Sequence, residues 1–131
     1  MTKQVIVMRT DLNMRRGKQI AQGAHASLAV ILNMMSNMKI QSGVVKTLSV
    51  MDETSLAHWL EESFTKICVG IDSEEKLKEI YNKAQEAGLP CAFIVDNGKT
   101  EFNGIPTATC CAIGPAYSED INKITGDLKL L

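Results

Sequence analysis

The chain has 131 residues, which is enough for one domain and too few for two of ordinary size. Apolar residues make up 45% of the sequence and charged residues 22%, a globular composition that excludes a disordered chain. The net charge of −1 conceals a polarity, because residues 1–46 carry +6 and residues 52–101 carry −6. One end of the molecule can therefore meet a polyanion, unless folding mixes the charges.

The first elements along the chain are a strand, a polar turn and a long helix. The β-branched run from Lys3 to Arg9 predicts a buried strand. A helix is expected from about Arg16 to Met38, with one apolar face that recurs at 3.6 residues per turn. That face consists of Ile20, Ala24, Leu28, Ile31 and Met35. Residues 39–51 are ambiguous, and a short helix is expected over residues 52–60.

The second half of the chain alternates strands and helices. Strands are expected over residues 64–71, 91–95 and 107–113, the last one stopped by Gly114 and Pro115. Ser73 caps the predicted start of a helix that ends at Gly88, and a short last helix opens at Ser118. Strands separated by a helix indicate a βαβ crossover. Residues 1–131 are therefore expected to form a single three-layer α/β domain around a four-stranded mixed sheet.

Neither a membrane segment nor a signal peptide is expected. No apolar run reaches the roughly 18 residues of a spanning helix, and the N-terminus has no small-residue cleavage site. The sequence therefore predicts a cytoplasmic protein without membrane contact.

The cysteines are Cys68, Cys91, Cys110 and Cys111. Each lies in an apolar run, which favours buried thiols over a disulfide framework or a metal site, and no cofactor is predicted.

Two polar clusters follow the ends of predicted strands, where open α/β sheets bind their ligands. The first cluster contains Arg15, Arg16 and Lys18, and the second contains Asp96, Lys99 and Thr100. If the two strands run parallel, both clusters face one crevice. No P-loop, no dinucleotide-binding glycine motif and no nucleophile elbow is present, so those enzyme classes lose support.

The start of the long helix is unusually basic. Arg15, Arg16 and Lys18 lie where the helix dipole is already positive, at a cost of about 0.3–1 kcal/mol each. Basic side chains and free N–H groups form an anion site, although a solvated turn also tolerates this repulsion. Lys18, Gln22 and His25 share one polar stripe that can hold a carbonyl or phosphate oxygen. Alternatively, His25 makes a structural hydrogen bond and Gln22 is an ordinary surface residue.

Three segments together resemble the archaeal and eukaryotic type of peptidyl-tRNA hydrolase, the second class of that enzyme. VIVMRTDLNMRRGKQIAQGAHASLAV resembles its opening strand with R-[NT]-D-L and G-K-x-A-A-Q-x-x-H-A. LPCAFIVDNGKTEF resembles its D-x-G-[RK]-T segment, and AIGPAYSEDINKITGDLKLL resembles its closing A-I-G-P segment. The resemblance spans nearly the whole chain. Arg15–Arg16, Ile20 and the loop after Thr100 depart from the family pattern.

The resemblance implies a hydrolase that cleaves the ester between a peptide and the 3′ end of tRNA. It also implies a four-stranded mixed sheet with helices on both faces, in a family whose members often form homodimers. The family places function on the positions matched here by Lys18, Gln22, Asp96 and Thr100, and His25 matches its histidine. A non-catalytic tRNA- or protein-binding member of the same fold is the rival hypothesis, and a hydrolase of another ester or amide is a third.

Ester hydrolysis needs an oriented water and donors for the developing oxyanion. Asp96 is expected to act as the base that positions the water, and Thr100 to orient Asp96 or the water. Lys18 and Gln22 are expected to donate to the oxyanion or to the departing ribose oxygen. Lys18 serves equally well to hold Asp96 or a terminal phosphate. The residues expected to bind the substrate are Arg15, Arg16, His25 and Lys99, with further phosphate contacts from Lys3, Lys39 or Lys46.

Overall fold

The computed structural model describes all residues from Met1 to Leu131. Its strands are β1 (Thr2–Arg9), β2 (Ser36–Ile40), β3 (Gly43–Thr47), β4 (Lys66–Ile71), β5 (Cys91–Asp96) and β6 (Thr107–Tyr117). Its helices are α1 (Arg16–Met34), α2 (Ser55–His58), the π-helical turn η1 (Trp59–Ser63), α3 (Glu74–Glu86) and α4 (Ser118–Thr125). The expected strands and helices of the second half are all present, with boundaries shifted by a few residues.

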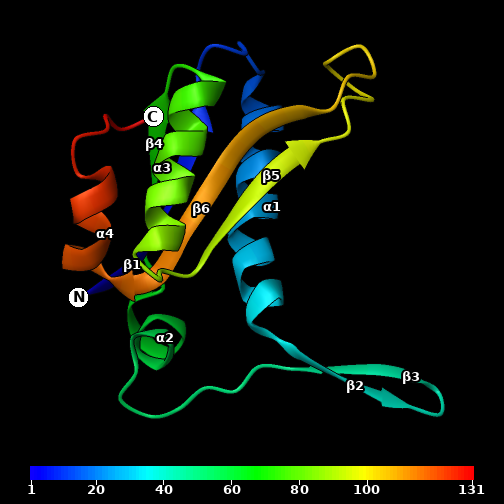
Figure 1. Cartoon of the computed structure of the whole chain (residues 1–131), viewed down its shortest axis with the longest axis vertical. Coiled ribbons are helices and arrows are strands. Elements are labelled where there is room, and N and C mark those ends of the chain that lie inside the picture. The colour runs from blue at the N-terminus through cyan, green and yellow to red at the C-terminus, as the bar shows by residue number, and fades with distance from the viewer.

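Four strands form the main sheet in the order β4-β1-β6-β5. Strand β1 is parallel to β4, while β6 is antiparallel to both β1 and β5. It follows that β1 and β5 run in the same direction and end at the same edge of the sheet (Figure 1). The predicted mixed four-stranded sheet is confirmed, and so is the parallel arrangement on which the shared crevice depends.

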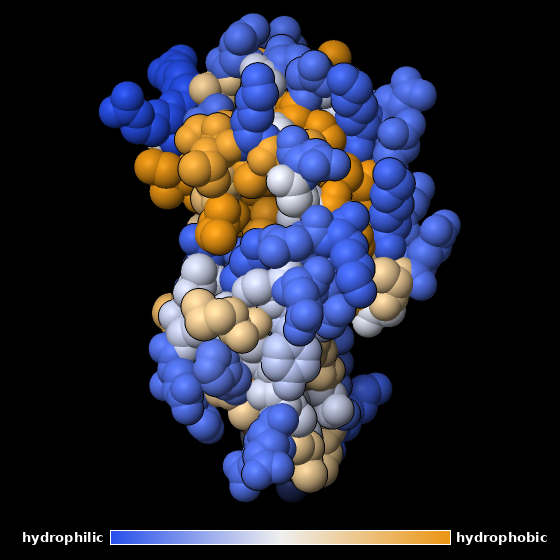
Figure 2. All heavy atoms as spheres, turned by 90° about the vertical axis from the view of Figure 1, so that its left-hand side faces the viewer, coloured by the Kyte–Doolittle hydropathy of each residue, from blue (hydrophilic) through white to orange (hydrophobic).

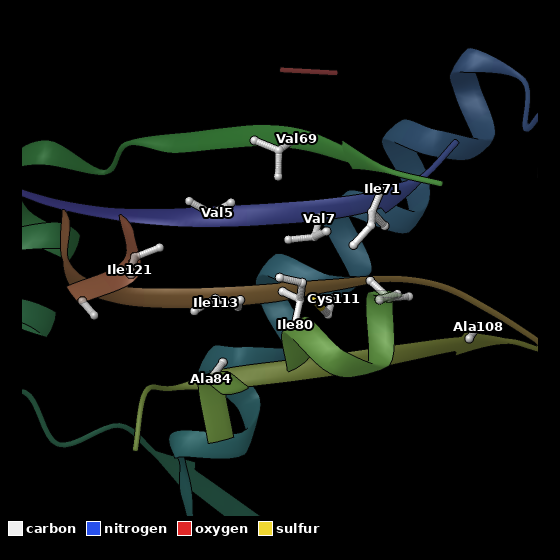
Figure 3. Packing of buried hydrophobic residues seen from close by; sticks show 12 residues of the cluster. Val5, Val7, Val69, Ile71, Ile80, Ala84, Ala108, Cys111, Ile113 and Ile121 are labelled. Carbon is white, nitrogen blue, oxygen red and sulfur yellow. The ribbon is translucent and has the colours of Figure 1, made fainter. Parts of the chain in front are cut away.

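Alternate residues of β1 serve two cores, one on each face of the sheet. Val5 and Val7 belong to the core under α3 and α4, which also contains Ile80, Ala84 and Ile121 (Figure 3). Ile6 and Met8 belong to the core under α1, which contributes Ala26 and Val30. The order of layers is therefore α1, sheet, and then α3 with α4, as the α/β pattern predicts.

The predicted apolar stripe of α1 does not face the sheet. The buried side of the helix consists of Gln22, Gly23, Ala26 and Val30. Ile20 and Leu28 of the stripe are 67% and 58% exposed. The small side chains of the buried side let the helix lie close to the sheet, which leaves the larger apolar residues on its flank.

Helix α1 also ends four residues earlier than expected, at Met34. Met35 and Met38 keep the apolar period, but residues 36–47 form the antiparallel hairpin β2–β3 instead. The β-branched pair Val44 and Val45 favours strand conformation. Gly43, with φ of 150°, permits the tight turn before them. Of the ambiguous residues 39–51, those up to Thr47 belong to this hairpin, and residues 48–51 have no regular secondary structure.

Strand β6 continues to Tyr117 rather than stopping at Gly114–Pro115. Opposite Gly114 and Pro115, the pairing of β1 with β6 shifts its register between Lys3 and Val5. Val5 is paired with Ile113, and Lys3 is paired with Ala116 beyond the irregular residues. Gly114 is required there, because its φ is 99° and a Cβ would lie 2.6 Å from the carbonyl oxygen of Lys3.

The C-terminal segment covers the edge strand β4. The amide of Leu131 donates to the carbonyl of Cys68 at 3.1 Å, and the amide of Gly70 donates to that of Lys129 at 2.9 Å. Figure 2 shows hydrophobic atoms gathered on the side of the molecule that carries this segment.

Cys68 is exposed, which corrects the expectation of four buried thiols, whereas Cys110 and Cys111 are buried. No helix is long and apolar enough to cross a bilayer.

Candidate active site

The start of α1 and the end of β5 meet at the sheet edge where β1 and β5 both finish. Lys18 lies in the first turn of α1, and Asp96 is the last residue of β5. The Lys18 Nζ is 3.1 Å from Oδ2 of Asp96, and both side chains are 12% exposed. The predicted meeting of the two polar clusters is therefore confirmed, with an ammonium and a carboxylate in direct contact.

Hydrogen bonds join two further residues to this ion pair. The Lys18 ammonium donates to the hydroxyl oxygen of Thr100 at 2.9 Å. The amide of Gln22 donates through Nε2 to Oδ1 of Asp96 at 3.1 Å. The backbone N–H of Gly98 donates to Oδ2 of Asp96 at 2.9 Å. The Asp96 carboxylate thus accepts three hydrogen bonds, and the four residues matched to the family motifs form one connected group.

The interior of the protein fixes Gln22. The hydroxyl of Thr109, on β6, donates to Oε1 of Gln22 at 2.6 Å. The thiol of Cys110 donates to the Gln22 main-chain carbonyl at 3.3 Å. Because Thr109 occupies the amide oxygen, the Nε2 group must face Asp96. Gln22 is only 1% exposed, so the interpretation of it as an ordinary surface residue is wrong.

Asp96 is held as a carboxylate. Its burial alone raises the pKa, but the Gly98 N–H, the Lys18 ammonium and the Gln22 amide together lower the pKa below its usual value. The ring of Phe102 lies 5.5 Å from the Lys18 Nζ and packs beside the ammonium. The centre is therefore a charged pair in a partly dry setting, where hydrogen bonds to a substrate are stronger than in open water.

The residues expected to bind substrate lie around this group rather than within it. The guanidinium of Arg15 is 87% exposed and 3.5 Å from Glu101. Arg16 lines an apolar groove on the other flank of α1, and Lys99 and His25 are exposed. None of the four shares a hydrogen bond with the ion pair. The structure brings together the four central residues and leaves these basic groups on the rim.

Sequence reasoning missed three residues that shape the site. Thr109 orients Gln22, Gly98 donates to Asp96, and Phe102 flanks Lys18. Thr109 stands between Ala108 and Cys110, and a hydroxyl inside such an apolar run is a signal that could have identified it. Gly98 has a φ of 80°, and a Cβ there would lie 2.2 Å from a carbonyl oxygen. The Asp-Asn-Gly turn signal predicted the turn but not its hydrogen bond to the carboxylate.

Replacing Thr109 by valine is expected to lower the free energy of unfolding by about 1–3 kcal/mol. The buried Oε1 of Gln22 would lose its only donor, and an unsatisfied buried acceptor costs that amount. Urea denaturation measures the effect. Thr107→Val on the same strand is the control, because the Thr107 hydroxyl bonds only to the loop carbonyl of Ile105. Equal effects of the two substitutions would contradict the role given to Thr109.

Comparison with known proteins agrees with this geometry. A family model described as peptidyl-tRNA hydrolase PTH2 matches residues 2–131. The chain belongs to the PTH2 family. A peptidyl-tRNA hydrolase of Methanocaldococcus jannaschii is 43% identical over 129 residues, which are 98% of this chain and 99% of the relative. One of Sulfurisphaera tokodaii is 45% identical over 130 residues, 99% of this chain and 98% of the relative. One of Metallosphaera sedula is 40% identical over 129 residues, with coverages of 98% and 99%.

Proposed function

We propose that this PTH2-family protein hydrolyses the ester between a peptidyl group and the 3′ ribose of tRNA, which releases free tRNA. The observation that carries the proposal is the ammonium of Lys18, which contacts both the Asp96 carboxylate and the Thr100 hydroxyl. Family membership over nearly the whole chain supports the same activity. Since this reaction belongs to translation, the proposed location is the cytoplasm.

Lys18 is the proposed donor to the oxyanion. An ammonium has three N–H groups, and Asp96 and Thr100 occupy two of them. The third is free to bond the ester carbonyl oxygen, on which negative charge develops as water attacks. The Asp96 carboxylate and the Thr100 hydroxyl hold the Lys18 ammonium in position, so the donor is in place before the substrate arrives.

Asp96 is proposed to orient the attacking water and to hold Lys18. A general base works best when its pKa lies near the working pH, and the pKa of Asp96 is lowered instead. Water bonded to this carboxylate attacks the carbonyl carbon, and the ester C–O bond then breaks. The proton lost by the water ends on the departing ribose oxygen, so both charged groups return to their initial states.

Gln22 and Thr100 take different parts in this scheme. Gln22 is too deeply buried to reach a substrate, so it is proposed as a positioning residue for Asp96. Thr100 is exposed, and its hydroxyl accepts from Lys18 while its own proton is free for the water or the ribose. The exposed cations Arg15, Arg16 and Lys99, with His25, are proposed to bind phosphates of the RNA end.

The turnover assay that tests this function uses N-acetylated aminoacyl-tRNA with a labelled amino acid. The expected result is release of acid-soluble label by the wild-type protein. Binding of the RNA without release would support the non-catalytic member of the fold instead. Cleavage of simple esters at the same rate, with no dependence on tRNA, would indicate a hydrolase of another ester.

A homodimer is the proposed assembly, formed through the groove on the flank of α1. This groove of about 780 Å³ is lined mainly by hydrophobic residues, among them Ile20, Leu28 and Phe64. All three are more than half exposed. Contiguous apolar surface of this kind is rare on monomers.

The variant Leu28→Glu is expected to be monomeric, because a carboxylate in this groove would lose its hydration on association. Sedimentation velocity distinguishes it from a dimeric wild type. Leu32→Glu, an exposed position of the same helix outside the groove, is the control and should leave the assembly unchanged. A monomeric wild type would contradict the proposed dimer.

A further inference from the structure

The hairpin β2–β3 packs on neither face of the sheet. It leaves the C-terminal end of α1 and extends away from the rest of the molecule (Figure 1). Nine of its ten strand residues are exposed, Val45 being the exception, and none belongs to either core. A lone two-stranded hairpin is marginally stable in water, so its stability is best explained by a surface that it meets.

The register gives the hairpin two different faces. Residues directly opposite in an antiparallel pair point to the same face. Asn37 is paired with Lys46, and Lys39 with Val44, so both lysines lie on one face. The Lys46 ammonium donates to the Asn37 side chain at 2.9 Å, which agrees with this assignment. Two cations on one side of a ribbon form a small surface complementary to a row of phosphates.

The charge pattern of the surrounding chain favours a polyanion over a protein partner. Between Asp11 and Asp52 the sequence has no acidic residue and five basic ones, Arg15, Arg16, Lys18, Lys39 and Lys46. This acid-free segment comprises α1 and the hairpin, whereas residues 52–101 carry −6. An RNA is therefore attracted to the segment of α1 and the hairpin and repelled by much of the remaining surface.

The two basic ends of this segment are separated by the length of α1. From Lys18 to Met34 the helix spans about 24 Å, at a rise of 1.5 Å per residue. The exposed surface between them carries Ala21, His25 and Leu32, which add no acidic charge. An RNA whose 3′ ester lies at Lys18 can run along this surface, and the hairpin then meets a part remote from the ester.

We propose that the lysine face of the hairpin is a second tRNA contact, which binds the phosphate backbone of the double-stranded arm. This inference rests on the proposed function. The contact is independent of base sequence, because two lysines at a backbone read only charge and shape. It contributes affinity for intact tRNA and leaves the chemical step unchanged.

The test is the double variant Lys39→Ala/Lys46→Ala, measured by fluorescence anisotropy with uncharged tRNA at several salt concentrations. Each lost phosphate contact lowers the slope of log Kd against log salt by about one. Between about 50 and 200 mM salt, the wild-type Kd should therefore rise about tenfold more than that of the variant. Lys78→Ala/Lys83→Ala on the far helix α3 removes the same charge and should leave the slope unchanged.

A second measurement locates the contact. With a short substrate that holds only the single-stranded 3′ end, the hairpin variant should match wild type in KM and kcat, whereas KM for intact peptidyl-tRNA should rise. An unchanged salt slope would overturn the proposal, as would an equal loss on the short substrate. A changed sedimentation coefficient with unaltered RNA affinity would assign the hairpin to a second copy of the chain. Absence of turnover in wild type would count against the proposed function, while the anisotropy data would still decide the hairpin contact.

Discussion

Replacing Lys18 by alanine is expected to lower kcat by about 10²–10³-fold with the fold intact, since loss of one preorganised oxyanion donor has that effect. The ammonium is the only cation within hydrogen-bond distance of Asp96 and Thr100. Its removal leaves Asp96 with the Gly98 and Gln22 donors, so the carboxylate stays in position but the oxyanion site is empty. KM should change less than kcat, because the donor acts on charge that develops only in the transition state.

Steady-state turnover of N-acetylated aminoacyl-tRNA measures both constants. Lys78→Ala is the matched control, because this lysine lies on α3 and makes only an exposed contact with Glu74 at 3.8 Å. The conservative variant Lys18→Arg keeps the charge but not the shape of the donor, and partial recovery is expected. A Lys18→Ala enzyme that keeps its kcat and loses only affinity would show that Lys18 binds a phosphate instead.

The central site could be predicted because its residues lie in short local motifs. Lys18 and Gln22 are one helical turn apart, and Asp96 directly follows a strand, so each position was readable from its own segment. The two motifs come together in one site only if β5 runs parallel to β1. The sequence did not show whether it does. The antiparallel β6 between these strands settles it, since two reversals make β1 and β5 parallel.

The errors arose where periodicity competes with packing. The stripe that begins at Ile20 has the period of a core-facing helix surface, yet the sheet selects the narrow side that contains Gly23 and Ala26. Small residues let a helix approach a sheet closely. Because such residues have low hydropathy, a hydropathy pattern does not identify them as the buried side of the helix. Hydrogen bonds between distant segments, such as that from Thr109 to Gln22, leave no periodic signal at all.

Replacing Asp96 by asparagine is expected to lower kcat by about 10²–10³-fold and to remove a pH dependence of stability. An amide keeps the shape of the side chain, but it loses the charge and turns one acceptor into a donor. That donor must face either the Gln22 amide or the Lys18 and Gly98 donors, so one hydrogen bond is replaced by a repulsive contact. The attacking water loses the carboxylate that orients it.

The stability of the same variant gives an independent test. Because the folded-state pKa of Asp96 is lowered, its carboxylate stabilises the folded protein above the unfolded-state pKa of about 3.9. This contribution is lost as the pH falls through the folded-state pKa. The difference in unfolding free energy between wild type and Asp96→Asn should therefore be large at neutral pH and shrink below about pH 3.9. Asp72→Asn breaks an exposed pair with Lys76 and should show a much smaller difference. If the difference in unfolding free energy between wild type and Asp96→Asn stayed constant with pH, the folded protein would not favour the charged form of Asp96.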